Sequence, residues 1–175
     1  MKTNLFYLLI VAGSVLYFIV ADTDTPNNTA QDGDGIVTVS ETDSAMNAAI
    51  AEARLHLDDF FAHAETDGSK WDGQFIKVGF PVSDLDQEHI WVVDFQRLDS
   101  GRFTGRLSNE PANLPDLHFG SKVEFSDDMI SDWGFMADGH GYGYYTLRAV
   151  IPMMKEQDAS AAKAFLATDP LPQDW

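Results

Sequence analysis

The chain has 175 residues, with 28 Asp and Glu against 11 Lys and Arg, a formal net charge of -17, and no cysteine. The acidity disfavours nucleic-acid binding, because phosphates would be repelled rather than neutralised. The lack of cysteine excludes disulfides, thiolate metal sites, a cysteine nucleophile and lipid attachment to cysteine. The length fits one ordinary domain with a tail, and the 45% hydrophobic content is enough for a real core.

The first 21 residues differ from the rest of the chain. Lys2 is their only charge, and an uncharged apolar run follows over residues 5–20. A basic start followed by an apolar run is typical of an exported protein. We therefore predict that the bulk of the chain is exported, either into the periplasm or anchored in the inner membrane with the domain outside the cytoplasm.

Cleavage of this segment is left open by the sequence. Ala21 is small, as a cleavage site requires, but Ile19 is not. The run from Thr3 to Ala21 approaches the roughly 20 residues that span a bilayer. The prediction for residues 1–21 is a signal peptide or an amino-terminal membrane anchor, with a transmembrane helix contacting the membrane through residues 5–21 if it is uncleaved.

Residues 22–41 are rich in Asp, Thr, Asn and Gly, and this composition predicts an acidic spacer. Within it Asp32, Asp34 and Glu41 fall at positions 3, 5 and 12 of a calcium-binding EF-hand loop, but Ala30 replaces the carboxylate of position 1. Two interpretations are a chance match in a linker and a weak extracellular calcium site. We expect no calcium-specific stabilisation, and we predict no metal and no cofactor.

Periodicity predicts the elements that follow. Apolar residues at helical spacing predict one long amphipathic helix from residue 40 to about 65. Alternation then predicts strands, and a second apolar pattern predicts a short helix over residues 153–166. The predicted strands cover residues 74–80, 88–96, 102–107, 122–126, 130–136 and 142–151. The fold class is α+β, with the long amino-terminal helix packed on a bent antiparallel sheet or small barrel-like sheet, a short carboxy-terminal helix, and a tail over residues 169–175.

Several segments in the same order carry a resemblance to a known family. They are AIAEAR at residues 49–54, FIKVGF at 75–80, EHIWV at 88–92, FTGRLSNEP at 103–111, GSKVEF at 120–125, ISDW at 130–133 and GYYTLR at 143–148. Over residues 45 to 151 the chain resembles DUF2314, the YegJ-like family of bacterial proteins of unknown function. The resemblance implies a domain over residues 42–152, and the helix and tail predicted over residues 153–175 lie outside it. The family occurs in small exported proteins and beside repeat modules, which implies an interaction role.

Three residues in the matching segments are candidates for acid–base chemistry: His89, Glu110 and Asp132. A histidine that acts as a general base needs an acidic partner within hydrogen-bond reach. The alternative for His89 is a structural hydrogen bond near the end of a strand. Glu110 alternatively belongs to a turn that Pro111 fixes.

Four further residues are candidates for ligand contact: Trp91, Asn109, Trp133 and Tyr144. Aromatic rings can stack on a ligand, and polar residues after strand ends are often binding residues. The alternatives are core packing for the two tryptophans, a local turn for Asn109 and strand formation for Tyr144.

No nucleotide-binding, zinc-protease or serine-hydrolase motif is present in the sequence. We therefore predict an exported, non-catalytic binding or interaction domain, with an unknown protein or small ligand of the cell envelope as partner. One alternative is a small hydrolase-type enzyme that uses His89 with Glu110 or Asp132. A second alternative is a structural component of the envelope.

Overall fold

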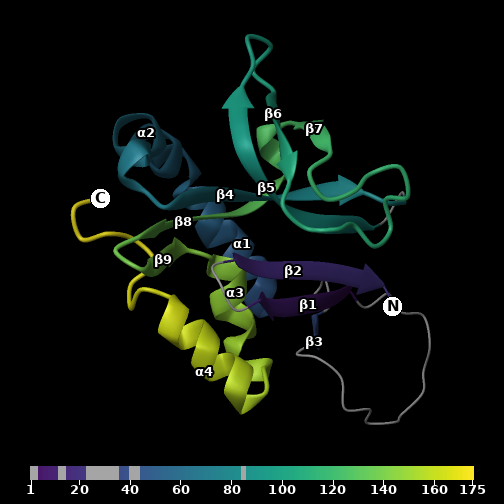
Figure 1. Ribbon diagram of the computed structural model, residues 1–175, viewed down its shortest axis with the longest axis vertical. Coiled ribbons are helices and arrows are strands. Elements are labelled where there is room, and N and C mark those ends of the chain that lie inside the picture. The colour runs from purple at the N-terminus through teal and green to yellow at the C-terminus, as the bar shows by residue number, and fades with distance from the viewer. Residues whose placement is uncertain (1–3, 12–14, 23–35, 40–43, 84–85) are drawn as a thin grey trace.

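The computed structural model describes residues 4–11, 15–22, 36–39, 44–83 and 86–175, with side chains from residue 44 onward. Its central element is a six-stranded antiparallel sheet with the order β7-β6-β5-β4-β8-β9 (Figure 1). The strands are β4 (Gly73–Pro81), β5 (Gln87–Arg97), β6 (Phe103–Leu107), β7 (Lys122–Phe125), β8 (Ile130–Ala137) and β9 (His140–Gly143). The sheet is open, because β7 and β9 each have a strand neighbour on one side only.

The sheet bends within β5. Asp94 has a positive φ of 51°, and the pairing of β5 with β6 shifts register between Val93 and Gln96. Such a bulge increases the local twist and turns the strand. Figure 1 accordingly shows β6 and β7 rising away from the part of the sheet formed by β4 and β8.

Helices cover the sheet on both faces, so that there are two cores. On one face Phe60 of α2 (Leu57–Asp67) packs with Ile76 and Trp133, beside the short helix η1 (Gly68–Lys70). On the other face Trp91 and Leu147 pack with residues of α3 (Tyr145–Val150), η3 (Ile151–Met153) and α4 (Glu156–Phe165). Figure 1 shows α2 on one side of β4 and β8, and α3 with α4 on the other. Because both faces are covered at the centre of the sheet, residues there that point away from the first core, such as Lys77, are also buried.

A second, three-stranded sheet comprises β1 (Asn4–Val11), β2 (Val15–Asp22) and β3 (Ile36–Val39), in the order β2-β1-β3. Strand β2 lies against β5. In the described part of the chain, no helix has both the length and the apolar character needed to cross a membrane. Export and the fate of residues 1–21 stay predictions. The calcium candidates Asp32, Asp34 and Glu41 lie outside the described residues.

The prediction of one long amino-terminal helix was wrong. The segment forms two shorter helices, α1 (Ser44–Leu55) and α2, separated at His56, where the backbone leaves helical geometry with φ −103° and ψ 12°. Its apolar stripe is divided between the two cores, since Met46 packs in the second core while Ala53 and Phe60 pack in the first. A periodicity count does not register this change of direction. The barrel-like alternative was also wrong, because the sheet does not close.

The strand predicted over residues 142–151 was wrong as well. Strand β9 ends at Gly143, Tyr144 has left-handed φ and ψ of 50° and 43°, and α3 begins at Tyr145. The predicted tail packs on the domain: the backbone N–H of Gly143 donates to the carbonyl of Pro170 at 2.7 Å, and Leu171 and Trp175 pack against the first core. The aromatic and β-branched content of residues 142–151 favours a strand locally. A partner distant in sequence decides the outcome, as the site below shows.

Candidate functional site

A row of side chains crosses the sheet on the face that carries the second core. Lys77 in the middle of β4 is paired in register with Asp132 of β8 on one side and Trp91 of β5 on the other. The Lys77 Nζ donates to Thr146 Oγ1 at 3.1 Å and lies 5.6 Å from the centroid of the Trp91 ring. All four side chains, Lys77, Trp91, Asp132 and Thr146, are buried, and we call them the polar row. Burial lowers the pKa of Lys77 to about 8, and the nearby Asp132 opposes this shift.

Asp132 uses both of its carboxylate oxygens. Oδ1 accepts hydrogen bonds from the backbone N–H of Trp133 at 2.8 Å and of Tyr145 at 3.1 Å. Oδ2 accepts from the backbone N–H of Thr146 at 2.8 Å and from its Oγ1 at 2.6 Å. Burial raises the pKa of Asp132, while Lys77 and these hydrogen bonds oppose the rise. The carboxylate of Asp132 therefore caps the first turn of α3 from a neighbouring strand. The first backbone N–H groups of a helix have no acceptor within the helix, so an acceptor from another element can stabilise them.

His89 adjoins the polar row, two residues before Trp91 on β5. It faces Gly79 across the pair β4–β5, and its Nδ1 lies 2.8 Å from Ser131 Oγ. Ser131 in turn donates to the carbonyl of Lys77 at 3.2 Å. Burial, helped by the positive charge of Lys77, lowers the pKa of His89 to about 3. The imidazole is therefore neutral near pH 7, and within the described residues it makes no hydrogen bond to a carboxylate.

Two acidic residues accept hydrogen bonds from the loop that follows β6, and neither belongs to the polar row. The buried carboxylate of Glu88 accepts the backbone N–H groups of Ala112 and Asn113 at 2.6 and 2.8 Å. Burial raises the pKa of Glu88 despite these two hydrogen bonds. Glu110 is exposed and accepts the N–H of Phe119 at 2.8 Å. Glu110 thus belongs to the surface of the loop and is not assembled with His89.

Asn109 joins the loop to β5. Its Oδ1 accepts the backbone N–H of Trp91 at 3.0 Å, which continues the strand pairing where β6 has ended. The residue is almost fully buried, and its Nδ2 has no hydrogen-bond partner among the described residues. The side-chain carbonyl of Asn109 therefore takes the place of a backbone carbonyl in the pairing with β5, and its Nδ2 group makes no hydrogen bond within the described residues.

The structure brings together some of the residues that the sequence singled out and separates others. Asp132 and Trp91 belong to the row, His89 and Asn109 adjoin it, and Tyr144 packs on Trp91 with ring centroids 5.3 Å apart. Trp133 points to the opposite face, where it is fully buried and donates its Nε1–H to the carbonyl of Ala53 at 2.8 Å.

Sequence reasoning missed Lys77, Ser131 and Thr146. A signal existed for Lys77, since it is the one charge within the apolar run FIKVGF. Alternation places this lysine on the face opposite Ile76, and the second core covers that face. Within the described part of the chain, no group of three or more His, Asp or Glu side chains is arranged to hold a metal ion.

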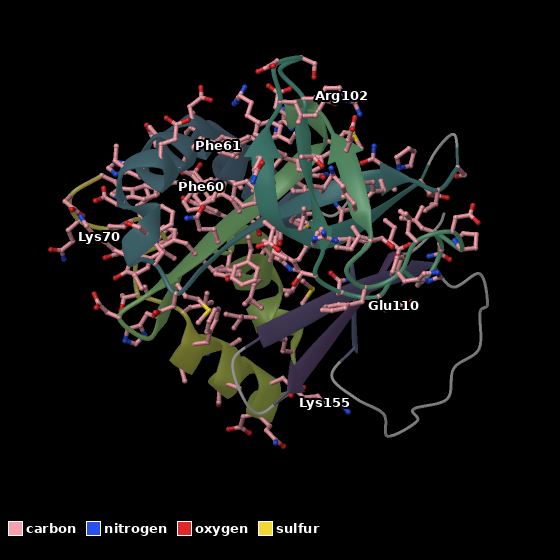
Figure 2. The ribbon with its side chains drawn as sticks, turned by 45° about the horizontal axis from the view of Figure 1, so that its top comes forward. Phe60, Phe61, Lys70, Arg102, Glu110 and Lys155 are labelled. Atoms are coloured by element: carbon pink, nitrogen blue, oxygen red, sulfur yellow. The ribbon has the colours of Figure 1, made fainter. Side chains whose placement is uncertain are left out.

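An open groove of about 790 Å³ lies elsewhere, between the β8–β9 hairpin and the segment of residues 166–175. Its aromatic lining includes Trp71, Phe135, Tyr142 and Trp175. The rings of Trp71 and Tyr142 stack on Phe135 with centroids 3.8 and 5.2 Å away, and Trp175 stacks on Phe135 at 5.3 Å. We call the Trp71, Phe135 and Tyr142 rings the aromatic floor. Lys70, which also lines the groove, and Glu110 lie on opposite sides of the molecule in Figure 2.

The other wall of the groove is the carboxy-terminal stretch of the same chain. Besides the bond from Gly143 to Pro170, the N–H of Ala167 donates to the carbonyl of Gly141 at 3.0 Å, so the segment lies along β9. Arg148 reinforces it by donating from its guanidinium to the carbonyl of Ala167 at 3.0 Å. The aromatic floor thus lies beside a polypeptide segment that backbone hydrogen bonds hold against β9.

A family model described as "Uncharacterized protein conserved in bacteria (DUF2314)" matches residues 43–166. The chain belongs to the DUF2314 family. The chain is similar to uncharacterized protein YegJ of Escherichia coli, with 27% identity over 154 residues that cover 87% of this chain and 94% of YegJ. It is also similar to a putative ankyrin repeat protein of Neisseria meningitidis, with 30% identity over 145 residues, 78% of this chain and 57% of that protein. No solved structure gives a significant match.

The DUF2314 match bears differently on the two regions. Every residue of the polar row, and the aromatic floor of the groove, falls within residues 43–166. The wall formed by residues 167–175 lies beyond the match. The resemblance to DUF2314 inferred from the sequence segments is thereby confirmed, and it brings no named activity with it.

Proposed function

We propose that the chain is an exported, non-catalytic binding domain and that its ligand is a polypeptide segment of a cell-envelope protein held in the groove. The observation that carries the proposal is the groove itself, an open concavity that combines an aromatic floor with many charged and polar side chains. Its volume is of the order that ligand sites have, and aromatic side chains are typical of such sites.

The packing of the groove supports a polypeptide as the ligand. The aromatic floor lies beside residues 166–175, a segment of the same chain that is joined to β9 by backbone hydrogen bonds. Leu171 and Trp175 of this segment pack against the first core, which includes Phe135. A surface that accommodates one polypeptide segment offers the apolar contacts that a second segment needs.

The state of the polar row supports binding over hydrolysis. Both carboxylate oxygens of Asp132 accept hydrogen bonds from the first turn of α3. Among the described residues, His89 contacts Ser131 and no carboxylate. A histidine with a pKa near 3 is a weak general base at neutral pH. The row fits a structural role, in which it connects β4, β5 and β8 to α3.

Export rests on the amino-terminal sequence, with Lys2 followed by the apolar run. A reporter that is active only outside the cytoplasm should be active when it is fused after Trp175. Activity of a cytoplasmic reporter at the same position, with silence of the exported one, would contradict this part of the proposal.

Binding is tested by selecting a random peptide library on the purified full-length chain. The selected peptides should lose at least tenfold in affinity for Tyr142→Ala, because Tyr142 contributes a half-buried ring of the aromatic floor. Phe119→Ala is the matched control, since Phe119 is 60% exposed and does not line the groove. Selection of no peptide, or equal loss in both variants, would contradict the groove as the site.

A further inference from the structure

The groove carries an excess of negative charge. Its lining includes one lysine, Lys70, and four aspartates: Asp67, Asp138, Asp169 and Asp174. The chain as a whole carries a net charge of -17. A concave site lined by one sign of charge concentrates ligands of the opposite sign, so both the groove and the surrounding field favour a cation.

Part of this charge is already balanced. Lys70 forms an ion pair with Asp67 at 2.5 Å and also interacts with Asp174. Asp169 interacts electrostatically with Arg148, but the hydrogen bonds of the Arg148 guanidinium go to the carbonyls of Gly143 and Ala167. Asp138 makes no hydrogen bond or ion pair with any other residue that the structure describes. Asp138, at the tip of the β8–β9 hairpin, is therefore the carboxylate best placed to receive a new cation.

The aromatic floor supplies a second contact for the same kind of group. Trp71 and Tyr142 are half-buried, so their rings lie at the groove surface while they stack on the buried Phe135. Tryptophan and tyrosine rings attract ammonium and guanidinium groups placed over their faces. The aliphatic stem of a lysine or arginine would pack on the same rings, since such stems bury readily on apolar surface.

We propose that the segment bound in the groove is basic, with a lysine or arginine side chain that contacts the aromatic floor and pairs with Asp138 and Asp169. This inference rests on the proposed function and names the chemistry of its ligand. Acidic segments are disfavoured by the same carboxylates, and the sign of the ligand charge is thus the specific claim.

Fluorescence anisotropy of labelled hexapeptides on the full-length chain tests the claim. The probes are Gly-Lys-Gly-Arg-Gly-Lys, its acidic counterpart Gly-Glu-Gly-Asp-Gly-Glu and the neutral Gly-Gln-Gly-Gln-Gly-Gln. We expect the basic peptide to bind best. Its affinity should fall about 5–10-fold in the double variant Asp138→Asn with Asp169→Asn, as loss of two partly exposed ion pairs implies. Asparagine tolerates the left-handed backbone of Asp138, so the fold should be kept.

The matched control is the double variant Asp99→Asn with Asp116→Asn. Both residues are exposed and outside the groove, and the change in net charge is the same. The control should bind the basic peptide within twofold of the unmodified chain. Equal loss in both double variants would mean that the overall field, and not the groove, attracts the peptide, and would overturn the inference. Preference for the neutral or acidic probe would overturn it too, while groove-dependent binding of library peptides would leave the proposed function intact.

Discussion

Asp132 and Thr146 lie 14 residues apart in the chain and are joined by two hydrogen bonds, both to the same carboxylate oxygen. One comes from the Thr146 backbone N–H at 2.8 Å and the other from its hydroxyl at 2.6 Å. The strand β8 thereby supplies the cap for a helix that has no side-chain cap of its own. Because Lys77 also donates to the Thr146 hydroxyl, three elements meet at one threonine.

Replacement of Asp132 by asparagine should destabilise the domain by roughly 3 kcal/mol or more. The amide would set an N–H₂ donor against the Thr146 donors and would remove the negative charge near buried Lys77. Urea unfolding at pH 7 measures the change. Asp128→Asn is the control, because Asp128 is exposed in the turn before β8, and it should stay within about 0.5 kcal/mol. Equal stability of the two variants would contradict the capping role.

This contact also explains why the sequence misassigned residues 142–151. Tyr142, Tyr144 and Tyr145 with Thr146 favour a strand by local propensity. The left-handed Tyr144 ends β9, and the acceptors that stabilise the first turn of α3 come from Asp132, which no local window includes. Tertiary capping therefore overrides propensity here.

The strands from residue 73 to 137 were predictable because they carry alternation and most of the turns between them are short, apart from the longer loop between β6 and β7. The polar row was not, since alternation places Lys77 on the face opposite Ile76 without saying what covers that face. Helix α3 and the residues around Trp91 cover it. The groove was also unpredictable, because it forms between a hairpin and a segment that sequence reasoning treated as a tail.

His89 should make the domain sensitive to acid. Its pKa is about 3 in the folded state against 6.5 in the unfolded chain, so between these values only the unfolded chain binds the proton. Stability is therefore lost as pH falls from 6.5 toward 3, by at most about 5 kcal/mol from this residue. Urea unfolding across this pH range should give a shallower decline for His89→Gln.

His118→Gln is the control for this titration, because its side chain is 71% exposed in the loop after β6. The control should follow the unmodified chain at every pH. A decline that is equally steep in the unmodified chain and in His89→Gln would show that His89 is not the group that resists protonation.

Trp133 should be among the most costly residues to truncate. It is fully buried, stacks on Phe60 at 4.9 Å and donates to the Ala53 carbonyl at the end of α1. Trp133→Ala should cost roughly 3–5 kcal/mol by urea unfolding, as deletion of a buried aromatic ring does. Phe119→Ala, at a 60% exposed ring, should cost no more than about 0.5 kcal/mol. An unchanged unfolding midpoint for Trp133→Ala would contradict its place in the core.

Gly143 and Gly101 allow backbone strain to be separated from steric conflict. Both have left-handed φ, 75° and 80°, so an alanine at either position pays a conformational penalty of about 1–2 kcal/mol. At Gly101 a new Cβ would meet nothing within 4 Å, whereas at Gly143 it would lie 2.4 Å from the Trp133 carbonyl oxygen and 2.6 Å from the Trp133 ring. Gly143→Ala should therefore cost about 2 kcal/mol more than Gly101→Ala in urea unfolding, since overpacking against a rigid core typically costs 1–3 kcal/mol. Equal costs would mean that β9 can move away from β8 freely, and the wall of the groove that pairs with Gly141 and Gly143 would then not be held in place.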